Sequence, residues 1–127
     1  MNEISILRNF KSAHVINLLE VFRDDERIYL ATVFCAGGEL FSLVEHRGAL
    51  TEIEAKNITR QLVTAVADMH LNGICHRDLK LENVLLESKT GLDVKIIDFG
   101  LSRCNGTDKL KTRIGTPYCV APEVILA

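Results

Sequence analysis

The sequence predicts an α+β fold, because short strand-like stretches alternate with amphipathic helical ones. Two apolar stretches, residues 15–22 and 28–34, flank a charged turn and predict an antiparallel hairpin. An apolar stripe of about five turns that begins after Thr51 predicts a long helix. Two further apolar segments, residues 84–86 and 94–97, are separated by a polar turn and predict a second pair of strands.

The other elements follow from the same kinds of pattern. Apolar residues at helical spacings predict a helix over residues 3–10, and a shorter one is expected over residues 39–46. Thr51 and Glu54 fit a capping box at the start of the long helix, and Gly73 suits the position just after its end. The apolar face predicted for this helix consists of Ile53, Ile58, Leu62, Ala65, Val66 and Met69.

The last part of the chain predicts a loop followed by the start of another helix. Residues 101–114 are polar and show no clear period, which is typical of a loop. Residues 115–117 form a Gly-Thr-Pro turn. Pro122 is well suited to the first position of a helix.

Length and composition exclude several classes of protein. The 127 residues suffice for one modest domain, and 47% hydrophobic with 25% charged residues indicates a globular chain. A net charge of -2 without a basic run does not favour nucleic acid as a partner. No apolar stretch approaches the roughly 18 residues of a membrane span, and the N-terminus does not resemble a signal peptide. We therefore expect a soluble, cytoplasmic protein with no membrane partner.

The four cysteines are not arranged as a metal or redox motif. They stand at positions 35, 75, 104 and 119, and no two of them form a Cys-x-x-Cys pair. Reduced thiols are expected in a cytosolic compartment. We expect Cys75 and Cys119 to be small, buried or half-buried thiols and not reactive groups.

Polar residues suited to metal and phosphate chemistry stand next to the second pair of strands. Asp78, Lys80 and Asn83 precede the strand at 84–86, and Asp98 follows the strand at 94–97. Two short strands joined by a polar turn would bring these groups side by side. Two carboxylates, a carboxamide and an ammonium would then converge on one small volume, which predicts a site for a divalent metal ion and phosphate.

Three motifs in this order resemble those of the eukaryotic protein kinases. They are His-Arg-Asp-Leu-Lys-Leu-Glu-Asn at 76–83, Asp-Phe-Gly at 98–100 and Ala-Pro-Glu at 121–123. Each alone could be a strand end or a turn, but the set leaves little room for chance. The resemblance implies a partial protein-kinase-like fold. Residues 1–33 would be a remnant of the small lobe, and residues 34–127 the hinge and the first part of the large lobe through the activation segment.

The resemblance assigns a catalytic role to each polar residue, with ATP and Mg²⁺ as cofactors. Asp98 would hold Mg²⁺ bridging the phosphates, and Asn83 would ligate a second Mg²⁺. Asp78 would orient the substrate hydroxyl and accept its proton, and Lys80 would sit near the γ-phosphate. Thr116 matches the residue that braces this Lys and Asp. Lys two residues after the catalytic Asp is the serine/threonine pattern, so the substrate would be a protein Ser or Thr.

Further residues match the nucleotide pocket of the family. Val33 and Cys35 would offer backbone groups to the adenine, and Glu39 matches a residue that often bonds the ribose. Leu85 is also placed among the nucleotide-binding residues, and Thr32 falls at the position that guards the back of the pocket. In the same family, residues matching His76 and Phe99 pack in a stack with those matching Leu7 and Leu18.

Three regulatory residues are implied as well. Glu3 matches the helix glutamate that pairs with the strand lysine in active kinases. Arg77 precedes the catalytic Asp, and kinases with this Arg are commonly switched by a phosphate on the activation segment. Thr112 matches the usual acceptor of that phosphate, which an upstream activating kinase would supply, and Thr107 is an alternative.

Several phrases resemble the calcium/calmodulin-dependent and calcium-dependent protein kinases in particular. They are Ile-Asp-Phe-Gly-Leu-Ser, Gly-Thr-Pro-Tyr-x-Val-Ala-Pro-Glu-Val, and Glu-Val-Phe at 20–22. Leu81, where many of these kinases have Pro, is a mild departure. No EF-hand loop or calmodulin-binding tail occurs in the 127 residues.

The 127 residues contain neither a Gly-rich phosphate loop nor a Val-Ala-x-Lys strand. We therefore expect an incomplete serine/threonine kinase catalytic domain that is inactive alone. We also expect it to be poorly stable alone, because leaving a few hundred Å² of apolar surface exposed forfeits several kcal/mol of stability, at roughly 25 cal/mol per Å². The alternative is a non-catalytic, truncated kinase product that acts as a binding or regulatory module. Phosphotransferases acting on small molecules are a distant third, because Gly-Thr-Pro before Ala-Pro-Glu argues against them.

Overall fold

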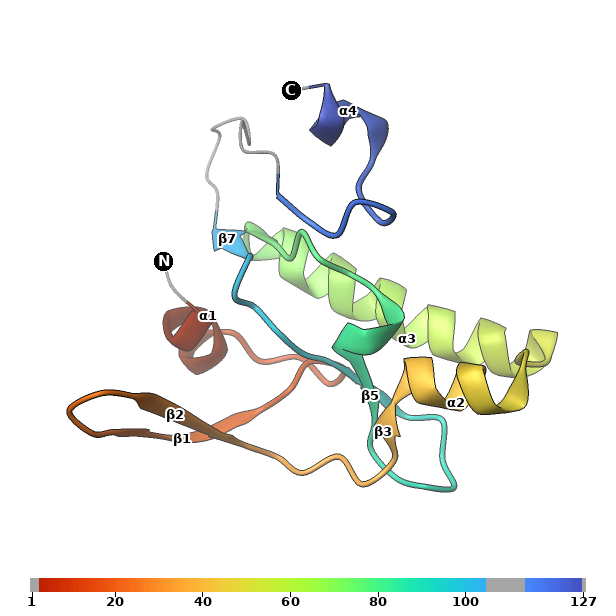
Figure 1. Ribbon diagram of the computed structural model, residues 1–127, viewed down its shortest axis with the longest axis horizontal. Coiled ribbons are helices and arrows are strands. Elements are labelled where there is room, and N and C mark those ends of the chain that lie inside the picture. Colours follow the sequence, from red (N-terminus) through yellow and green to blue (C-terminus); the bar gives the residue numbers. More distant parts are fainter. Residues whose placement is uncertain (1–2, 105–113, 127) are drawn as a thin grey trace.

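The computed structural model describes residues 3–104 and 114–126 and has the α+β architecture expected (Figure 1). Within these residues the strands form three small antiparallel sheets, ordered β1-β2, β3-β5-β6 and β4-β7. The elements are α1 (Glu3–Asn9), β1 (Leu18–Arg23), β2 (Ile28–Thr32), β3 (Gly38–Glu39), α2 (Leu40–Arg47), α3 (Glu52–Leu71), β4 (Ile74–Cys75), the 3₁₀ turn η1 (Leu81–Asn83), β5 (Val84–Leu86), β6 (Val94–Ile96), β7 (Arg103–Cys104) and α4 (Pro122–Ile125).

The predicted hairpin is present, but its first strand begins later than expected. β1 and β2 pair in antiparallel register and project as one arm of the molecule (Figure 1). Residues Val15 and Ile16 belong to a different contact, because Val15 bridges Ile96 and the Ile16 N–H donates to the Ile96 carbonyl at 2.9 Å. The apolar stretch at 15–22 is therefore divided between two partners, which its sequence pattern alone does not reveal.

The long helix α3 has the predicted capping box. The Thr51 hydroxyl accepts the Glu54 N–H at 3.3 Å, and the Glu54 carboxylate accepts the Thr51 N–H at 2.9 Å. Hydrogen bonds from Thr51 and Arg47 lower the pKa of Glu54 to about 2. Gly73, at a φ of 68°, follows the helix as predicted, since this left-handed conformation favours glycine.

The prediction of the apolar face of α3 is wrong for one residue. Ile58, Ala65 and Met69 are buried, but Ile53 is 83% exposed. Five residues separate Ile53 from Ile58, which at 100° per residue places them about 140° apart around the helix. The buried stripe instead includes the polar residue Gln61.

Two apolar clusters form the core, and β6 contributes to both. One is centred on Phe99 and Met69; the other is centred on Leu40 and Ile58. Ile96 belongs to the first cluster and Val94 to the second. The packing expected for the residues of the stack is confirmed. Their side chains are buried, and the rings of His76 and Phe99 meet edge to face with centroids 5.0 Å apart; these residues are Leu7, Leu18, His76 and Phe99.

The predicted loop at 101–114 is wrong at Arg103–Cys104, which form β7 and pair with β4, whereas residues 101–102 belong to no helix or strand; residues 105–113 lie outside the described residues. Pro122 begins α4 as expected, at one end of the molecule (Figure 1). Cys75 is half-buried as expected, whereas Cys119 is exposed because it lies in a surface turn. In the described parts of the chain, no helix is long and apolar enough to cross a membrane.

Candidate active site

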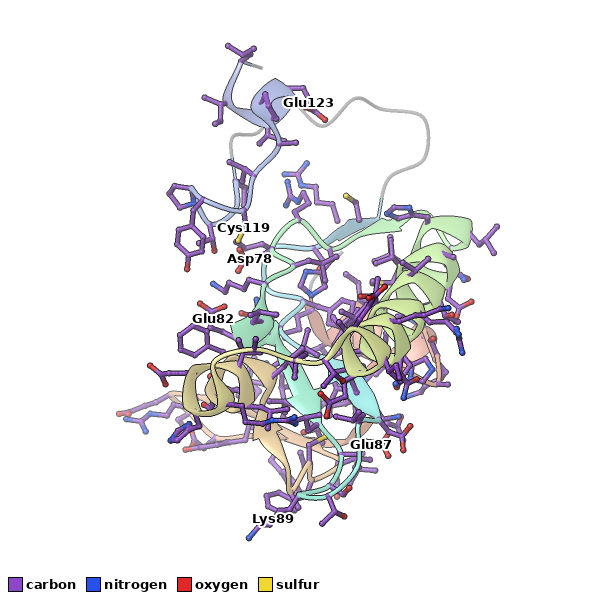
Figure 2. All side chains as sticks on the ribbon, turned by 90° about the vertical axis from the view of Figure 1, so that its right-hand side faces the viewer. Asp78, Glu82, Glu87, Lys89, Cys119 and Glu123 are labelled. Carbon is purple, nitrogen blue, oxygen red and sulfur yellow. The ribbon has the colours of Figure 1, made fainter. Side chains whose placement is uncertain are left out.

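The strands β5 and β6 bring the two predicted polar groups together. Asn83 stands directly before β5 and Asp98 lies just after β6, and the antiparallel pairing of Val84 with Ile96 places both at the same end of the pair. The Ile97 N–H also donates to the Asn83 carbonyl at 2.9 Å. In Figure 2, Glu87 and Lys89 of the connecting turn lie toward the bottom of the view, well below Asp78, which lies near its middle. The structure therefore brings Asn83 and Asp98 to the same end of the strand pair.

Asp78 is the most fully hydrogen-bonded carboxylate of the site. It is 7% exposed, and both of its carboxylate oxygens accept hydrogen bonds. Oδ1 accepts the Thr116 backbone N–H at 3.0 Å and the Thr116 hydroxyl at 2.5 Å. Oδ2 lies 3.1 Å from the Lys80 ammonium and accepts the Asn83 carboxamide N–H at 3.2 Å. The carboxylate is therefore fixed in orientation by three side chains of this chain.

These contacts also set the protonation of the pair. Burial acts to raise the pKa of Asp78, but hydrogen bonds from Thr116 and Lys80 together outweigh burial and lower it. The hydrogen bond to Asp78 raises the pKa of Lys80. Asp78 is therefore a carboxylate, and Lys80 an ammonium, throughout the neutral range.

Thr116 is carried to the site by a turn that requires glycine. Gly115 has a φ of 131°, and a Cβ there would lie 2.5 Å from Val120 and 2.9 Å from the Arg77 carbonyl. Any larger residue would push the turn away from the catalytic loop. With glycine present, the Thr116 hydroxyl reaches Asp78 and also accepts a hydrogen bond from Lys80 Nζ at 3.0 Å.

The His76 imidazole is neutral and hydrogen-bonds to two parts of the backbone near the site. Burial lowers its pKa, against the hydrogen bond to Ile97 and the charges of Asp98 and Asp78. Nε2 donates to the Ile97 carbonyl at 3.0 Å, and Nδ1 accepts the Asp78 N–H at 3.3 Å. One ring thus ties the backbone at Asp78 to the backbone just before Asp98.

Asp98 and Asn83 fit a hard divalent cation. Asp98 has a φ of 62°, and its Oδ1 accepts the Gly100 N–H at 3.1 Å. Asn83 donates from its carboxamide nitrogen to Asp78, which leaves its carboxamide oxygen to serve as a ligand. No group of three or more His, Cys, Asp or Glu side chains suited to a metal occurs among the described residues. A cation here would need further oxygen ligands, and Mg²⁺ commonly takes these from substrate phosphates and water.

Two of the predicted nucleotide residues belong to the same sheet, since Glu39 of β3 pairs with Leu85 of β5. The residues just before β3 continue this contact, because the Gly37 N–H donates to the Leu86 carbonyl and the Ala36 N–H to the Glu87 carbonyl, each at 3.0 Å. The Val33 N–H donates to the Asn17 carbonyl at 3.0 Å, so Val33 has only its carbonyl left to offer a ligand. Cys35 is buried, and burial raises the pKa of its thiol.

Glu3 lies against the Asp-Phe-Gly segment. Its Oε1 accepts the Phe99 N–H at 3.1 Å, which links α1 to the residue after Asp98. The predicted regulatory residue Glu3 is therefore in contact with the site.

Arg77 stands next to Asp78 in the chain, but its side chain bonds to a different segment. Its Nε donates to the Leu101 carbonyl at 2.6 Å, while its Nη1 is buried and has no hydrogen-bond partner in the part of the chain that the structure describes. Burial, and then the charge of Arg103, lowers the pKa of Arg77. Thr112 and Thr107 lie outside the described residues.

Sequence reasoning missed two polar contacts near the site. Tyr118 donates to the Glu82 carboxylate at 3.3 Å, beside a cavity of about 560 Å³ that also borders Lys80. Gln61 is buried and bonds to the backbone around β6. A polar residue within the apolar face of α3 is the signal that could have found Gln61; nothing in the pattern marks Tyr118.

Comparison with known proteins agrees with this geometry. The protein kinase domain family matches residues 1–127. The chain is 45% identical over 126 residues to calcium-dependent protein kinase 3 of Plasmodium yoelii yoelii, covering 97% of this chain and 23% of that protein. It is 44% identical over 126 residues to a probable myosin light chain kinase of Dictyostelium discoideum, covering 97% and 32%. It is also 44% identical over 125 residues to CBL-interacting serine/threonine-protein kinase 24 of Arabidopsis thaliana, covering 97% and 28%.

The chain thus spans about a quarter to a third of the length of these relatives. The family match extends over the whole of the chain, including Asp78, Lys80, Asn83 and Asp98. The chain belongs to the protein kinase domain family.

Proposed function

We propose that this chain carries the catalytic centre of a serine/threonine protein kinase, which transfers the γ-phosphate of ATP to a Ser or Thr hydroxyl of a protein. The observation that carries the proposal is the Asp78 carboxylate, held by Thr116 and Lys80. A carboxylate braced by an ammonium and a hydroxyl suits the alignment of a nucleophilic alcohol. The name of the Arabidopsis relative, a serine/threonine-protein kinase, supports the same class of acceptor.

The reaction needs little covalent chemistry from the protein. The substrate oxygen bonds to the γ-phosphorus, the bond from that phosphorus to the bridging oxygen breaks, and ADP leaves. Asp78, whose lowered pKa keeps it ionised, orients the hydroxyl and receives its proton. Lys80 lies 3.1 Å from Asp78 and offsets the charge of the phosphoryl group as it moves. Asn83 and Asp98 would hold Mg²⁺, which neutralises phosphate charge when bound.

The nucleotide would lie along the hinge. We assign the Val33 carbonyl and the Cys35 backbone to the adenine, Glu39 to the ribose, and Leu85 to the floor beneath the base. The pairing of Glu39 with Leu85 supports a common site for these contacts. On this assignment, residues 1–33 belong to the small lobe and residues 34–127 to the hinge and large lobe.

Arg77 supports regulation by phosphorylation. A buried guanidinium nitrogen without a partner among the described residues is costly, and a phosphate would satisfy it. We propose that phosphate on Thr112, added by an upstream kinase, pairs with Arg77. Glu3, which touches Phe99, would couple the position of α1 to the Asp-Phe-Gly segment.

The test is a phosphotransfer assay on the protein expressed in its full natural reading frame. Radiolabelled ATP with Mg²⁺ is offered with a serine-containing peptide library and with the same library carrying alanine in place of serine and threonine. We expect label in the first library alone, and its loss in Asp78→Asn. Transfer that persists in Asp78→Asn would contradict the assignment.

A non-catalytic binding module is the second candidate, favoured by one contact. The Glu3 carboxylate, which matches the glutamate that pairs with a lysine in active kinases, accepts the Phe99 N–H. The coding sequence on either side decides between the two candidates. An upstream Gly-rich loop and lysine would support the enzyme, and their absence from the reading frame would support the binding module.

A further inference from the structure

The outer edge of β6 is completed by groups that do not belong to a strand of its sheet. β5 pairs with one edge of β6. On the other edge, Ile96 exchanges both of its backbone hydrogen bonds, each 2.9 Å long, with the segment at 14–16. His14 Nδ1 donates to the Val94 carbonyl at 3.3 Å, since a carbonyl can only accept. β6 is therefore held along both edges.

Gln61 of α3 closes the start of that outer edge. Its Oε1 accepts the Val94 N–H at 3.0 Å, and its Nε2 donates to the Leu92 carbonyl at 2.8 Å. One carboxamide thus bonds to the backbone on both sides of Asp93, as a neighbouring strand would. Gln61 is 7% exposed, so these bonds form away from water, where an unmade bond is costly.

This contact matters because the β5–β6 pair is very short. Three residue pairs define its register, with one backbone bond beyond them at each end: Val84 with Ile96, Leu85 with Lys95, and Leu86 with Val94. A slip of one residue would move the end of β6 by about 3.3 Å and turn its side chains to the opposite face. Asn83 precedes β5 and Asp98 follows β6, so the register fixes their separation.

We propose that Gln61 is a positioning residue that fixes the register of β6 and thereby the spacing of Asn83 and Asp98, the pair assigned to Mg²⁺. The part of the inference that concerns the metal rests on the proposed function. The part that concerns the register of β6 does not. Gln61 touches neither the metal pair nor Asp78, and its contacts with the strand region are the bonds to Leu92 and Val94. A purely structural role would lower stability without a selective effect on metal binding.

The test compares Gln61→Met with Ile58→Val in the protein expressed in its full natural reading frame. Methionine keeps the length of the side chain and removes both bonds. Ile58 is 3% exposed on the same helix and forms none of the bonds to β6, so Ile58→Val is the control for a small loss of stability. Gln61→Glu keeps the acceptor for Val94 and loses the donor to Leu92, and it serves if Gln61→Met does not fold.

Two measurements avoid any reliance on turnover. Amide hydrogen exchange reports on Val94 and Ile97, and titration of Mg²⁺ with a fluorescent ATP analogue reports on the metal pair. In Gln61→Met we expect exchange at both amides to quicken about ten-fold, and the Mg²⁺ concentration for half-saturation to rise about ten-fold. Nucleotide binding without Mg²⁺ should stay unchanged, and Ile58→Val should alter neither measurement.

Equal changes in Gln61→Met and Ile58→Val would overturn the proposal, as would faster exchange at Val94 with an unaltered Mg²⁺ titration. If the unsubstituted protein shows no Mg²⁺-dependent nucleotide binding, the proposed function fails and the metal half of this inference fails with it. The exchange rates at Val94 and Ile97 still test, independently, whether Gln61 fixes the register of β6.

Discussion

Asp78 and Asp98 are the two carboxylates of the site, and the fold treats them differently. Asp78 is 7% exposed, and Thr116, Lys80 and Asn83 contact both of its oxygens. Asp98 is exposed, and in the described part of the chain its carboxylate accepts only the Gly100 N–H. Groups of this chain contact both carboxylate oxygens of Asp78, whereas the Asp98 carboxylate is available to a ligand from outside the chain. This difference supports a base role for the first and a metal role for the second.

The two carboxylates are nevertheless held in one frame. His76 joins the Asp78 N–H to the Ile97 carbonyl, and Asn83 joins the Asp78 side chain to the Ile97 N–H. Each bridge connects the catalytic loop to the residue just before Asp98. The separation of Asp78 and Asp98 is therefore fixed twice, by the His76 ring and by Asn83, whose carboxamide donates to Asp78 and whose backbone carbonyl accepts the Ile97 N–H.

The largest effect is expected when each carboxylate is made neutral in turn. Asp78→Asn should retain Mg²⁺-dependent nucleotide binding and lose transfer by about 10²- to 10⁴-fold, because only the base is removed. Asp98→Asn should lose both, because the metal ligand is removed. Nucleotide titrations with and without Mg²⁺, alongside the phosphotransfer rate, check this. Equal loss of nucleotide binding in the two variants would contradict the comparison.

A smaller effect is expected when the hydrogen bond from the Thr116 side chain to Asp78 is removed and Asp98 is unchanged. Thr116→Val deletes the hydroxyl that donates to Asp78 and accepts from Lys80. We expect transfer to slow by roughly 10- to 100-fold, from the loss of one charge-assisted hydrogen bond and the misplacement of Lys80. Thr116→Ser should recover most of the rate. Thr64→Val is the control, since Thr64 bonds only to the Arg60 carbonyl on exposed α3. A rate in Thr116→Val no lower than in this control would count against the brace.

Much of this site could be predicted from the sequence, because its chemistry is concentrated in short motifs. Asp78, Lys80 and Asn83 lie within six residues, and apolar segments mark the strands that bring Asp98 to them. The capping box of α3 is also local, since Thr51 and Glu54 are three residues apart. Local spacing is the information that a single sequence carries best.

What could not be predicted depends on contacts between distant residues. The apolar stretch at 15–22 gave no sign that Val15 and Ile16 would join β6, some 80 residues away. β7 has a polar sequence, and it becomes a strand only because β4 lies beside it. The partnerless Nη1 of Arg77 is likewise a property of packing and not of pattern. The roles assigned to Val33, Cys35, Glu39, Leu85 and Thr112 stay predictions.

A pH titration of stability would sharpen the account of Asp78. Its pKa is lowered in the folded state, so its ionised form stabilises the fold above the unfolded value of about 3.9, and that contribution is lost as the pH falls toward the folded value. The free energy of unfolding, from denaturant titrations at a series of acidic pH values, should fall with pH, and the fall should be shallower in Asp78→Asn. An identical slope in the two proteins would show that Asp78 is not stabilised by these contacts.

The smallest effect is expected far from both carboxylates, at the start of α3. Thr51→Ala removes the hydroxyl that caps the helix and one contact of Glu54, and should lower the free energy of unfolding by about 1 kcal/mol. The transfer rate per folded molecule should not change, because neither the contacts of Asp78 nor the register of β6 involves Thr51. Thermal denaturation and phosphotransfer on the same preparation check both parts. A selective loss of transfer in Thr51→Ala would mean that the site depends on the general stability of α3, and the contrast between a braced Asp78 and an open Asp98 would then lose its local explanation.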